Sequence, residues 1–532
     1  MKQELIDNLV KTFFTCNRDD LVRIFTELLN TMAAEETLSV TEFMSRNYET
    51  AQNNPEIHML PGNLKDARDA IFPYFWGTDG WFSKLHLENV KGPANYASLV
   101  GAMACLLKNP NLCVDTYSQR SNELEVKAIT TLANLFFYHI ENPWGIFTMG
   151  GTISNLYGGK IGIEKVSPHT MEKGIGKENI AGIVSRAAHY SNETLAGWLG
   201  IGTKNLHAIP TDSAYSMDID ALHSKLAELY EGKARVAFVI ATFGSTDASG
   251  IDDVAKIRDV IEEAAKKFRV PAPQLHVDAA AGWPLCFLNE YDTKTNPFEL
   301  HTDVLNMIPK IKVKALAIKH ADSVTIDFHK MGWGHYPSSA FIVRRRDDLA
   351  LLLRKKEQVP YFSEADYRHD PALFTLECSR PAIGPYAVMA SLDGIGLTGY
   401  QVLVSHALGL AADLKKRIEK LDYCKVLNKA CLGPHVLFWV LPKGRNAGKI
   451  YNDLIQGSLT EEEYGRYFHE TARLFEKRKA AMDPNIDARL SFTTACGYFP
   501  HGISIPAWKG VFFNPRTDSA VIDQLIASIE EL

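Results

Sequence analysis

The chain has 532 residues, of which 46% are hydrophobic and 23% are charged, and its formal net charge at pH 7 is −6. This length allows one large domain with smaller ones, and the hydrophobic fraction allows a substantial core. The acidic charge gives no reason to expect nucleic acid or an anionic membrane as partner. Eight scattered cysteines without a CxxC pair suit a reducing cytoplasm. The N-terminus lacks a signal-type apolar core, and the longest charge-free run (142–159) contains proline and glycines, so we expect no membrane span.

The first 90 residues differ in pattern from the rest of the chain. Residues 1–35 carry apolar side chains at helical spacing, which predicts two helices separated near Asn17. These helices precede the first strand-rich region, so we expect them to pack on another subunit. Residues 51–90 are turn-rich and aromatic and give no functional signal. We assign residues 1–90 to an N-terminal helical and dimerisation segment.

From about residue 120 the chain alternates between helix and strand patterns. The strands predicted here are Trp144–Met149, Ile180–Val184, Val236–Thr242, Leu275–Ala279 and Ser323–Phe328. The helices predicted among them are Glu123–His139, Asp218–Tyr230 and Asp253–Phe268. Strands that are apolar on both faces and separated by helices form a largely parallel sheet with helices on both sides. We therefore assign residues 91–385 to a large α/β domain.

After about residue 385 the pattern changes to that of a smaller α+β domain, residues 386–532. A helix over Gly399–Leu421 is followed by short strands near Val436–Leu441, and the chain ends in a helix from Asp518. The predicted fold class is therefore α/β. It has a mostly parallel central sheet flanked by helices, an N-terminal helical segment and a small C-terminal α+β domain.

Lys330 stands where the predicted strand Ser323–Phe328 ends, before a Gly-rich aromatic segment. A lysine at the end of a buried strand is costly unless it is paired with an anion, neutral or used covalently. Desolvated lysine amines form Schiff bases with carbonyl cofactors. Taken alone, the residue also fits a surface lysine after an edge strand.

Other polar residues follow the remaining predicted strands. The turn Gly150–Thr152 leads from strand to helix, and its free N–H groups favour a phosphate. Asp278 is followed by small residues that leave room for a flat ring, and a pyridinium N–H would be a cationic partner for its carboxylate. His189 could stack on a planar cofactor. An ordinary turn, a structural aspartate and a packed histidine are the alternatives, but the carboxyl ends of parallel strands share one edge, where ligands bind.

Two motifs support a different class of enzyme. His276-Val277-Asp278 and Asp327-Phe328-His329 place two histidines and two aspartates at strand ends, which suits a metal-dependent hydrolase. That interpretation leaves Lys330 and Gly150–Thr152 without a role. A non-catalytic protein that keeps the fold is a further alternative, although the number of polar strand-end residues argues against it.

With these residues assembled, the sequence resembles the group II pyridoxal-phosphate-dependent amino-acid decarboxylases over roughly residues 85 to 400. The matching segments, in the family's order, are Glu123–Glu125, Thr148–Asn155, Ala188–Ser191, Ala241–Thr246 with Gly250–Asp252, His276–Ala280, Ala321–Lys330 and Leu376–Arg380. The Asp-x-His-Lys-Met-Gly form at Asp327–Gly332 is most similar to microbial tyrosine decarboxylase-like members. The departures are Phe328, where proline is common, and the run Ala281–Pro284. The resemblance implies the fold-type I of PLP-dependent transferases and a homodimer with shared active sites.

The resemblance also implies a role for individual residues. Lys330 would bind the cofactor covalently until the substrate amine displaces it, Asp278 would keep the ring nitrogen protonated, and His189 would stack over the ring. The other residues expected to bind the cofactor are Gly150, Gly151, Thr152, Ser245, Thr246, Ala280, Asp327 and His329. The candidates for substrate contact are His86, Tyr96 and Arg380, of which the arginine could also orient the site electrostatically or bridge domains.

In this family a mobile loop from the neighbouring subunit carries a tyrosine that delivers a proton to Cα. Tyr361 in the segment Gln358–Ser363 matches this position, and Tyr367 is the second choice. Phe362 is adjacent, and a phenylalanine at this position is associated in the family with formation of an aldehyde instead of the amine. A one-residue shift of the alignment would therefore change the predicted product.

The prediction for function is a cytoplasmic, PLP-dependent carboxy-lyase that converts an L-amino acid to its amine and CO2. A tyrosine-like aromatic substrate is favoured by the form of the lysine motif and by the aromatic residues near Tyr96 and Trp333. The alternatives are decarboxylation of glutamate or aspartate, another PLP-dependent carbon–carbon lyase, and the metal-dependent hydrolase.

Overall fold

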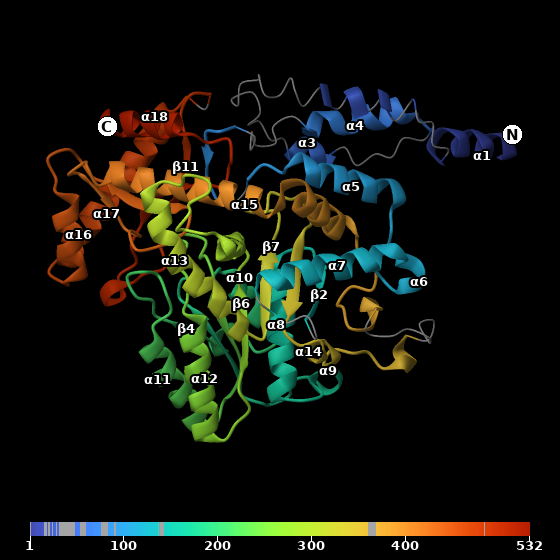
Figure 1. Ribbon diagram of the computed structural model, residues 1–532, viewed down its shortest axis with the longest axis horizontal. Helices are drawn as coiled ribbons and strands as arrows, with labels where there is room; N and C mark the ends of the chain where they lie inside the picture. The colour runs from blue at the N-terminus through green and yellow to red at the C-terminus, as the bar shows by residue number, and fades with distance from the viewer. Residues whose placement is uncertain are drawn as a thin grey trace.

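The computed structural model describes most of the chain from residue 83 onward and shorter segments before it. The described residues are 83–89, 92–136, 138, 143–359, 369–483 and 485–532, together with 2–14, 48–53, 60–75 and single positions between 19 and 30. Within them the strands form two sheets. Figure 1 shows helices on both sides of the larger sheet, and α1 at one end of the molecule, away from both sheets.

The larger sheet has seven strands in the order β2-β8-β7-β6-β5-β3-β4. Their bounds are β2 Trp144–Thr148, β3 Ile180–Ser185, β4 Leu206–Ile209, β5 Arg235–Thr242, β6 Gln274–Asp278, β7 Ser323–Asp327 and β8 Ser339–Val343. β8 is antiparallel to both of its neighbours, β2 and β7, and the other neighbouring pairs are parallel. Six strands therefore run in one direction, and their carboxyl ends share one edge of the sheet.

The five strands predicted from the sequence are confirmed, each with ends within one residue of the prediction. Their interiors are buried on both sides, as the unbroken apolar runs indicated. Two strands of this sheet, β4 and β8, were not predicted from the sequence. β4 is a four-residue edge strand with one buried residue, so it carries no apolar run.

The helices of the large-sheet region are α5 Tyr96–Lys108, α6 Asp115–Ser118, α7 Arg120–Leu135, α8 Gly151–Val166, α9 Thr170–Lys173, α10 Ser191–Trp198, α11 Ile219–Glu231, α12 Val254–Phe268, α13 Thr302–Leu316 and α14 Asp347–Ala350. The helices before and after it are α1 Lys2–Leu9, α3 Tyr48–Asn53, α4 Leu64–Phe75, α15 Ile383–Ile418, α16 Ala447–Ile455, α17 Glu461–Ala481 and α18 Ser519–Glu530. The shorter π and 3₁₀ segments are η1 Val10–Phe14, η3 Thr203–Asn205, η4 Trp283–Glu290, η5 Ala317–His320, η6 Lys356–Gln358, η8 Pro371–Leu373 and η9 Pro500–Gly502.

Two cores cover the faces of the large sheet. α8 packs against β5, β6, β7 and β8 on one face. α7, α11 and α12 contribute their buried apolar residues to the main core on the other. The helices begin where side chains cap them: Asp218 accepts a hydrogen bond from the N–H of Ala221 at the start of α11, and Asp253 does the same for Lys256 at α12. Capping and a single apolar stripe explain why these helices were predictable.

The smaller sheet combines one early strand, β1, with four strands from residues 424–511 of the chain. Its five strands lie in the order β1-β11-β12-β10-β9, with bounds β1 His86–Leu87, β9 Cys424–Val426, β10 His435–Val440, β11 Arg489–Thr493 and β12 Ala507–Val511. β1 pairs in parallel with β11, so that His86 stands opposite Arg489. A strand from the segment assigned to the N-terminal region thus completes the sheet of the C-terminal region.

α15 connects the two sheets. It begins at Ile383, earlier than the predicted Gly399, and is kinked at Gly396, whose φ of 70° lies in the left-handed region. It packs against α5, α7 and α18. Among the described residues it is the one helix of 18 or more residues that is apolar enough to cross a membrane by length and composition.

Close contact between α5 and α15 depends on a glycine. A Cβ at Gly101 would lie 2.3 Å from the carbonyl oxygen of Tyr386 on α15. We expect Gly101→Ala to push the helices apart and lower the free energy of unfolding by about 1–3 kcal/mol. Gly465→Ala is the matched control, because this helical glycine has no atom within 4 Å of its added Cβ, and it should be neutral or stabilising. Urea and thermal unfolding measure both, and equal stability of the two variants would contradict the prediction.

Candidate active site

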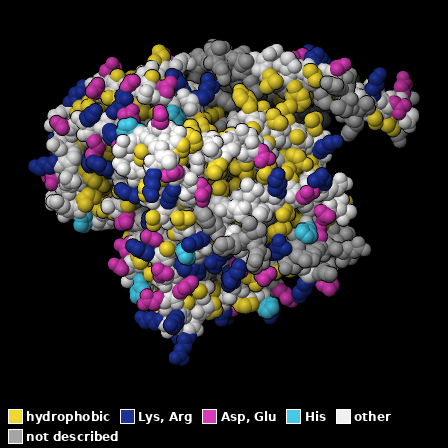
Figure 2. Space-filling view, viewed as in Figure 1, with side chains coloured by type: hydrophobic (Ala, Val, Ile, Leu, Met, Phe, Trp, Pro, Cys, Tyr) yellow, Lys and Arg dark blue, Asp and Glu magenta, His cyan; other side chains and the backbone are white. Residues whose placement is uncertain are grey.

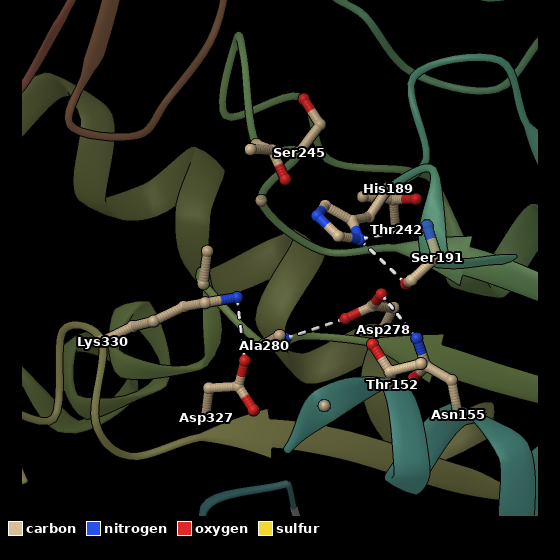
Figure 3. Close-up of a pocket in the computed structure, with 14 residues that line it drawn as sticks. Thr152, Asn155, His189, Ser191, Thr242, Ser245, Asp278, Ala280, Asp327 and Lys330 are labelled. Atoms are coloured by element: carbon tan, nitrogen blue, oxygen red, sulfur yellow. Dashed lines mark hydrogen bonds and ion pairs between the residues drawn. The ribbon is translucent and has the colours of Figure 1, made fainter. Parts of the chain in front are cut away.

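A pocket lies at the carboxyl edge of the large sheet, next to the ends of β2, β3, β5, β6 and β7. It is lined by Gly151, Thr152, Asn155, His189, Ser191, Thr242, Gly244, Ser245, Thr246, Asp278, Ala280, Ala281, Asp327 and Lys330. Figure 3 shows that the polar side chains of several of these residues turn toward one space, although they come from different strands. The common direction of six strands places these residues together, as expected for sheets of this kind.

Lys330 follows β7 and forms an ion pair inside this pocket. Its Nζ lies 2.8 Å from Oδ2 of Asp327, and its side chain is 17% exposed. Burial alone lowers the pKa of Lys330, but the carboxylates of Asp327 and Asp278 outweigh burial, so that its pKa is raised. Asp327 also accepts a hydrogen bond of 2.5 Å from the hydroxyl of Ser339. The amine is therefore anchored as an ammonium group in the pocket.

Asp278 ends β6 and has a hydrogen bond on each carboxylate oxygen. Nδ2 of Asn155 donates to Oδ2 at 2.8 Å, and the backbone N–H of Ala280 donates to Oδ1 at 3.1 Å. The side chain is buried but still lines the pocket. A buried carboxylate that is bonded only by neutral N–H groups attracts a cation that enters the pocket.

His189 follows β3 and lines the pocket with its imidazole ring. The backbone N–H of Ser191 donates to its Nδ1 at 3.2 Å, and the hydroxyl of Ser191 lies 2.8 Å from the same atom. Burial lowers the pKa of His189, so the ring is neutral at pH 7. With Nδ1 accepting, the remaining proton is on Nε2. A neutral, flat ring suits stacking on a planar cofactor.

The N-terminus of α8 opens onto the same pocket. α8 begins at Gly151, and a Cβ at this residue would lie 2.9 Å from Oδ1 of Asp327. The glycine therefore allows the helix start to approach β7. The N–H groups of Ile153 and Ser154 bond the carbonyl of Gly150. The helix start at Gly151 and Thr152, with the Thr152 hydroxyl, forms a site that suits a phosphate group.

The pocket also contains donors and acceptors that were not predicted from the sequence. Asn155, Ser191, Thr242, Gly244 and Ala281 line it in addition to the predicted residues. The hydroxyl of Thr242 is buried and has no hydrogen-bond partner within the described residues. Most of these residues stand inside the motifs that carry the family resemblance, and that position is the sequence signal that indicates them.

The donor set matches the groups of pyridoxal phosphate. A lysine amine, a carboxylate, a neutral imidazole and a helix N-terminus face one space, and they correspond to an aldehyde, a pyridine nitrogen, a flat ring and a phosphate. The polar lining also leaves the Thr242 hydroxyl available for a further hydrogen bond. The residues present therefore fit this cofactor.

Comparison with known proteins agrees with this fit. The sequence matches the pyridoxal-dependent decarboxylase conserved domain over residues 48–441, and the chain belongs to this family. It is 24% identical over 392 residues to the acidic amino acid decarboxylase GADL1 of Xenopus tropicalis, covering 73% of this chain and 67% of that protein. It is 28% identical over 259 residues to the L-tyrosine decarboxylase of Enterococcus faecium, covering 45% of this chain and 41% of that protein.

A solved structure gives the same fold. The crystal structure of Oryza sativa TDC with PLP and tryptamine superposes with a TM-score of 0.77 at 15% identity, covering 98% of this chain and 99% of that chain. The protein therefore has the fold-type I of PLP-dependent enzymes. It is a PLP-dependent amino-acid decarboxylase, and pyridoxal phosphate is its cofactor.

The three residues expected to contact substrate lie outside this pocket lining. His86 is buried in β1 of the smaller sheet, and Tyr96 begins α5 with 73% of its surface exposed. Arg380 is buried and binds both carboxylate oxygens of Glu125, at 2.7 and 2.8 Å. Its guanidinium charge is balanced by Glu125 and does not face the pocket. The structure supports a bridging role for Arg380 over a substrate contact.

The other expected residues lie beside the pocket or outside the described chain. Gly150 is the residue before α8, with extended backbone at φ 178°. His329 is buried, with its ring stacked at 3.7 Å between centroids on Tyr336 and its Nε2 3.7 Å from Oδ2 of Asp327. Tyr361 and its second choice Tyr367 lie outside the described residues.

The set required by the hydrolase interpretation is not assembled. His276 is fully buried, and both of its ring nitrogens lie within 3.0 Å of protein oxygens from Ser323, Asn155 and Thr325. Its ring therefore does not share the pocket with Asp278. Among the described residues, no group of three or more histidine, cysteine or carboxylate side chains is arranged to hold a metal ion.

We expect the purified protein to be yellow and borohydride to fix the cofactor on Lys330. Lys330→Ala should keep the fold but lose the fixed cofactor, because no other amine lines the described pocket. Absorption spectra, circular dichroism and peptide mass spectrometry measure these outcomes. A borohydride label on another lysine would contradict the assignment, and an insensitive spectrum with stoichiometric zinc would favour the hydrolase.

Proposed function

We propose that the protein decarboxylates a tyrosine-like aromatic L-amino acid to its amine and CO2. The observation that carries this proposal is the charge of the pocket. Among the described lining residues the only lysine or arginine is Lys330, which the cofactor requires, and Arg380 is bound to Glu125. An acidic substrate would place a second carboxylate in the site and would need a further cation as its partner. An uncharged aromatic side chain has no such requirement.

Aromatic side chains close to the pocket support the same proposal. Tyr336 stacks on His329, and its phenol is close enough to Lys330 and Asp327 for their charges to act on it. Burial and the carboxylate of Asp327 raise the pKa of Tyr336, so its hydroxyl stays protonated. Tyr190 packs on His189 with ring centroids 4.1 Å apart, and 77% of its surface is exposed. Both rings offer apolar surface beside the cofactor residues.

Decarboxylation of an acidic amino acid is the second candidate. Its support is the similarity to the acidic amino acid decarboxylase GADL1, which extends over a larger share of this chain than the similarity to L-tyrosine decarboxylase. The cation for the substrate side chain would then come from residues outside the described lining. The measured substrate range distinguishes the two candidates.

The residues of this chain divide the work of the reaction. Bound pyridoxal phosphate would supply the acceptor for the electrons of the Cα–carboxylate bond. Lys330 would hold the cofactor covalently through its amine. Asp278 would hold the proton on the ring nitrogen, and the start of α8 at Gly151 and Thr152 would bind the phosphate. His189 would cover one face of the cofactor ring and exclude water from it.

The homodimer is also part of this proposal. Figure 2 shows hydrophobic side chains gathered around α5 and the adjacent part of α15. Tyr96, Val100, Leu106 and Leu107 on α5 are each at least 65% exposed. Large contiguous apolar surfaces on soluble proteins mark interaction sites. We infer that a second copy of the chain covers this surface and contributes Tyr361 to the active site of the first.

Release of CO2 from each of the twenty amino acids tests the substrate. We expect turnover of tyrosine or another aromatic L-amino acid and negligible turnover of glutamate and aspartate, because a buried unpaired carboxylate costs several kcal/mol of binding. Steady-state assays with PLP-saturated enzyme give the comparison. Turnover confined to glutamate or aspartate would refute the aromatic proposal and leave the decarboxylase assignment intact.

Tyr361→Phe tests the proposed proton donor. A general acid typically contributes about 10²–10⁴-fold, so we expect amine formation to fall by that order and some aldehyde to appear. Tyr367→Phe is the control, because it makes the same change at a nearby tyrosine, and it should lower amine formation only slightly. Mixing refolded Tyr361→Phe and Lys330→Ala subunits should restore amine formation that neither variant has alone, because one hybrid site then holds both residues. Wild-type rates for Tyr361→Phe, or no restoration, would refute the shared-site assignment.

A further inference from the structure

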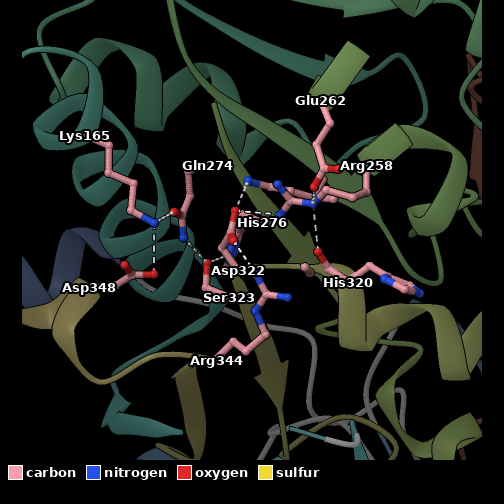
Figure 4. Close-up of polar contacts among 12 residues, drawn as sticks. Lys165, Arg258, Glu262, Gln274, His276, His320, Asp322, Ser323, Arg344 and Asp348 are labelled. Carbon is pink, nitrogen blue, oxygen red and sulfur yellow. Dashed lines mark hydrogen bonds and ion pairs between the residues drawn. The ribbon is translucent and has the colours of Figure 1, made fainter. Parts of the chain in front are cut away.

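A continuous row of hydrogen bonds runs behind the pocket to Asp278. Nζ of Lys165 lies 2.6 Å from Oε1 of Gln274, whose Nε2 lies 3.0 Å from Oγ of Ser323. Oγ of Ser323 lies 2.8 Å from Nδ1 of His276. Figure 4 shows this part of the row, from the α8 side chain of Lys165 across β6 and β7.

The row continues from the histidine into the pocket. Nε2 of His276 lies 3.0 Å from Oδ1 of Asn155, and Nδ2 of Asn155 lies 2.8 Å from Oδ2 of Asp278. Figure 3 shows this last contact at the pocket. We call the five bonds from Lys165 to Asp278 the hydrogen-bond relay. Gln274, Ser323, His276 and Asn155, which lie between its ends, are each at most 2% exposed.

The two ends of the relay fix the direction of every bond in it. The Lys165 ammonium has donors and no acceptor, so Oε1 of Gln274 accepts and Nε2 of Gln274 donates onward. The single hydroxyl proton of Ser323 then goes to Nδ1 of His276. A neutral imidazole with Nδ1 accepting carries its proton on Nε2, which donates to Asn155. Nδ2 of Asn155 is left to donate to the Asp278 carboxylate, which can only accept.

The surroundings of His276 agree with this direction. Burial lowers the pKa of His276 to about 3, so the ring is neutral and has one proton to place. Thr325 Oγ1, 3.0 Å from Nε2, is a second acceptor for that proton and does not reverse the row. Gly158 leaves room for the ring, since a Cβ there would lie 2.8 Å from Nδ1 of His276. The ring therefore fits tightly between α8 and β6.

We propose that Asn155 and His276 are positioning residues that hold the Asp278 carboxylate in place for the ring nitrogen of the cofactor. This inference rests on the role of Asp278 under the proposed function. The relay fixes the orientation of the Asn155 amide, so that its Nδ2 donates to Oδ2 of Asp278 and its Oδ1 faces His276. The Ala280 N–H donates to the other oxygen, so that each carboxylate oxygen has one hydrogen bond while the side chain still lines the pocket.

The test compares pyridoxal phosphate with its analogue in which CH replaces the ring nitrogen. Both carry the aldehyde and the phosphate, but only pyridoxal phosphate contacts Asp278 through a ring N–H. Equilibrium binding to the full-length apoprotein is followed by absorbance and fluorescence, so the readout does not depend on catalysis. We expect Asn155→Leu to lose about 10-fold or more in affinity for pyridoxal phosphate and to change little toward the analogue. Ser323→Ala should shift the affinity ratio in the same direction by less, because it leaves the His276 tautomer undetermined.

Ser154→Ala is the matched control. Ser154 is the buried neighbour of Asn155 on α8 and bonds Thr148 at 2.7 Å, outside the relay. This change should affect both cofactors equally, as any purely structural disturbance of α8 would. Thermal unfolding of each apoprotein checks the fold, and Ser323→Ala serves if Asn155→Leu does not fold.

The outcomes separate the relay from the role of Asp278. If the wild type binds pyridoxal phosphate and its analogue with equal affinity, Asp278 does not act on the ring nitrogen. The role of Asp278 and the role of the relay are then both overturned. If the wild type prefers pyridoxal phosphate and Asp278→Ala removes that preference, the role of Asp278 stands. Unchanged preference in Asn155→Leu and Ser323→Ala would then show that the relay is only structural.

Discussion

The structure depends on the burial of one ammonium group between two carboxylates at the edge of the large sheet. Lys330 pairs with Asp327 at 2.8 Å, and the charges of both Asp327 and Asp278 raise its pKa against the effect of burial. Burying an unpaired charge costs several kcal/mol, so each of these side chains requires the others or a ligand. The parallel strands meet this requirement because β6 and β7 are neighbours whose carboxyl ends lie side by side. The order and direction of the strands thus bring the charged residues of the site together.

A second buried ion pair holds the strand that leads into α8. Arg380 binds Glu125 through two hydrogen bonds and also donates to the carbonyl of Phe147 at 3.1 Å. Glu125 in turn accepts from the N–H of Phe147 at 2.9 Å. The pair therefore binds both the N–H and the carbonyl of Phe147 in β2, three positions before the turn at Gly150. The pair thus anchors the end of β2 close to the start of α8, which gives Arg380 a structural role outside the described pocket lining.

How much could be predicted from the sequence depends on the range of the interactions concerned. Strands β5 and β6 were predictable because their apolar runs and the residues that end them are local features. The placement of Asp278 and Lys330 in one pocket followed from the strand direction alone. The position of His86 opposite Arg489 in the smaller sheet was not predictable, because this pairing joins residues far apart in the sequence. Asn155 was visible in a motif, but its role required knowing that α8 lies over β6.

The chemistry of the pocket lining explains why the reaction was easier to infer than the substrate. The described lining consists of glycine, alanine, hydroxyl, amide, imidazole, carboxylate and amine groups, and it contains no large apolar side chain. Such a lining recognises the polar groups of a cofactor and, apart from offering no second cation to an acidic side chain, gives little discrimination among amino-acid side chains. Selectivity must then come from side chains around the pocket, such as Tyr336. Relatives at 24% and 28% identity act on acidic amino acids and on tyrosine by their names, which agrees with a constant cofactor site and a variable surround.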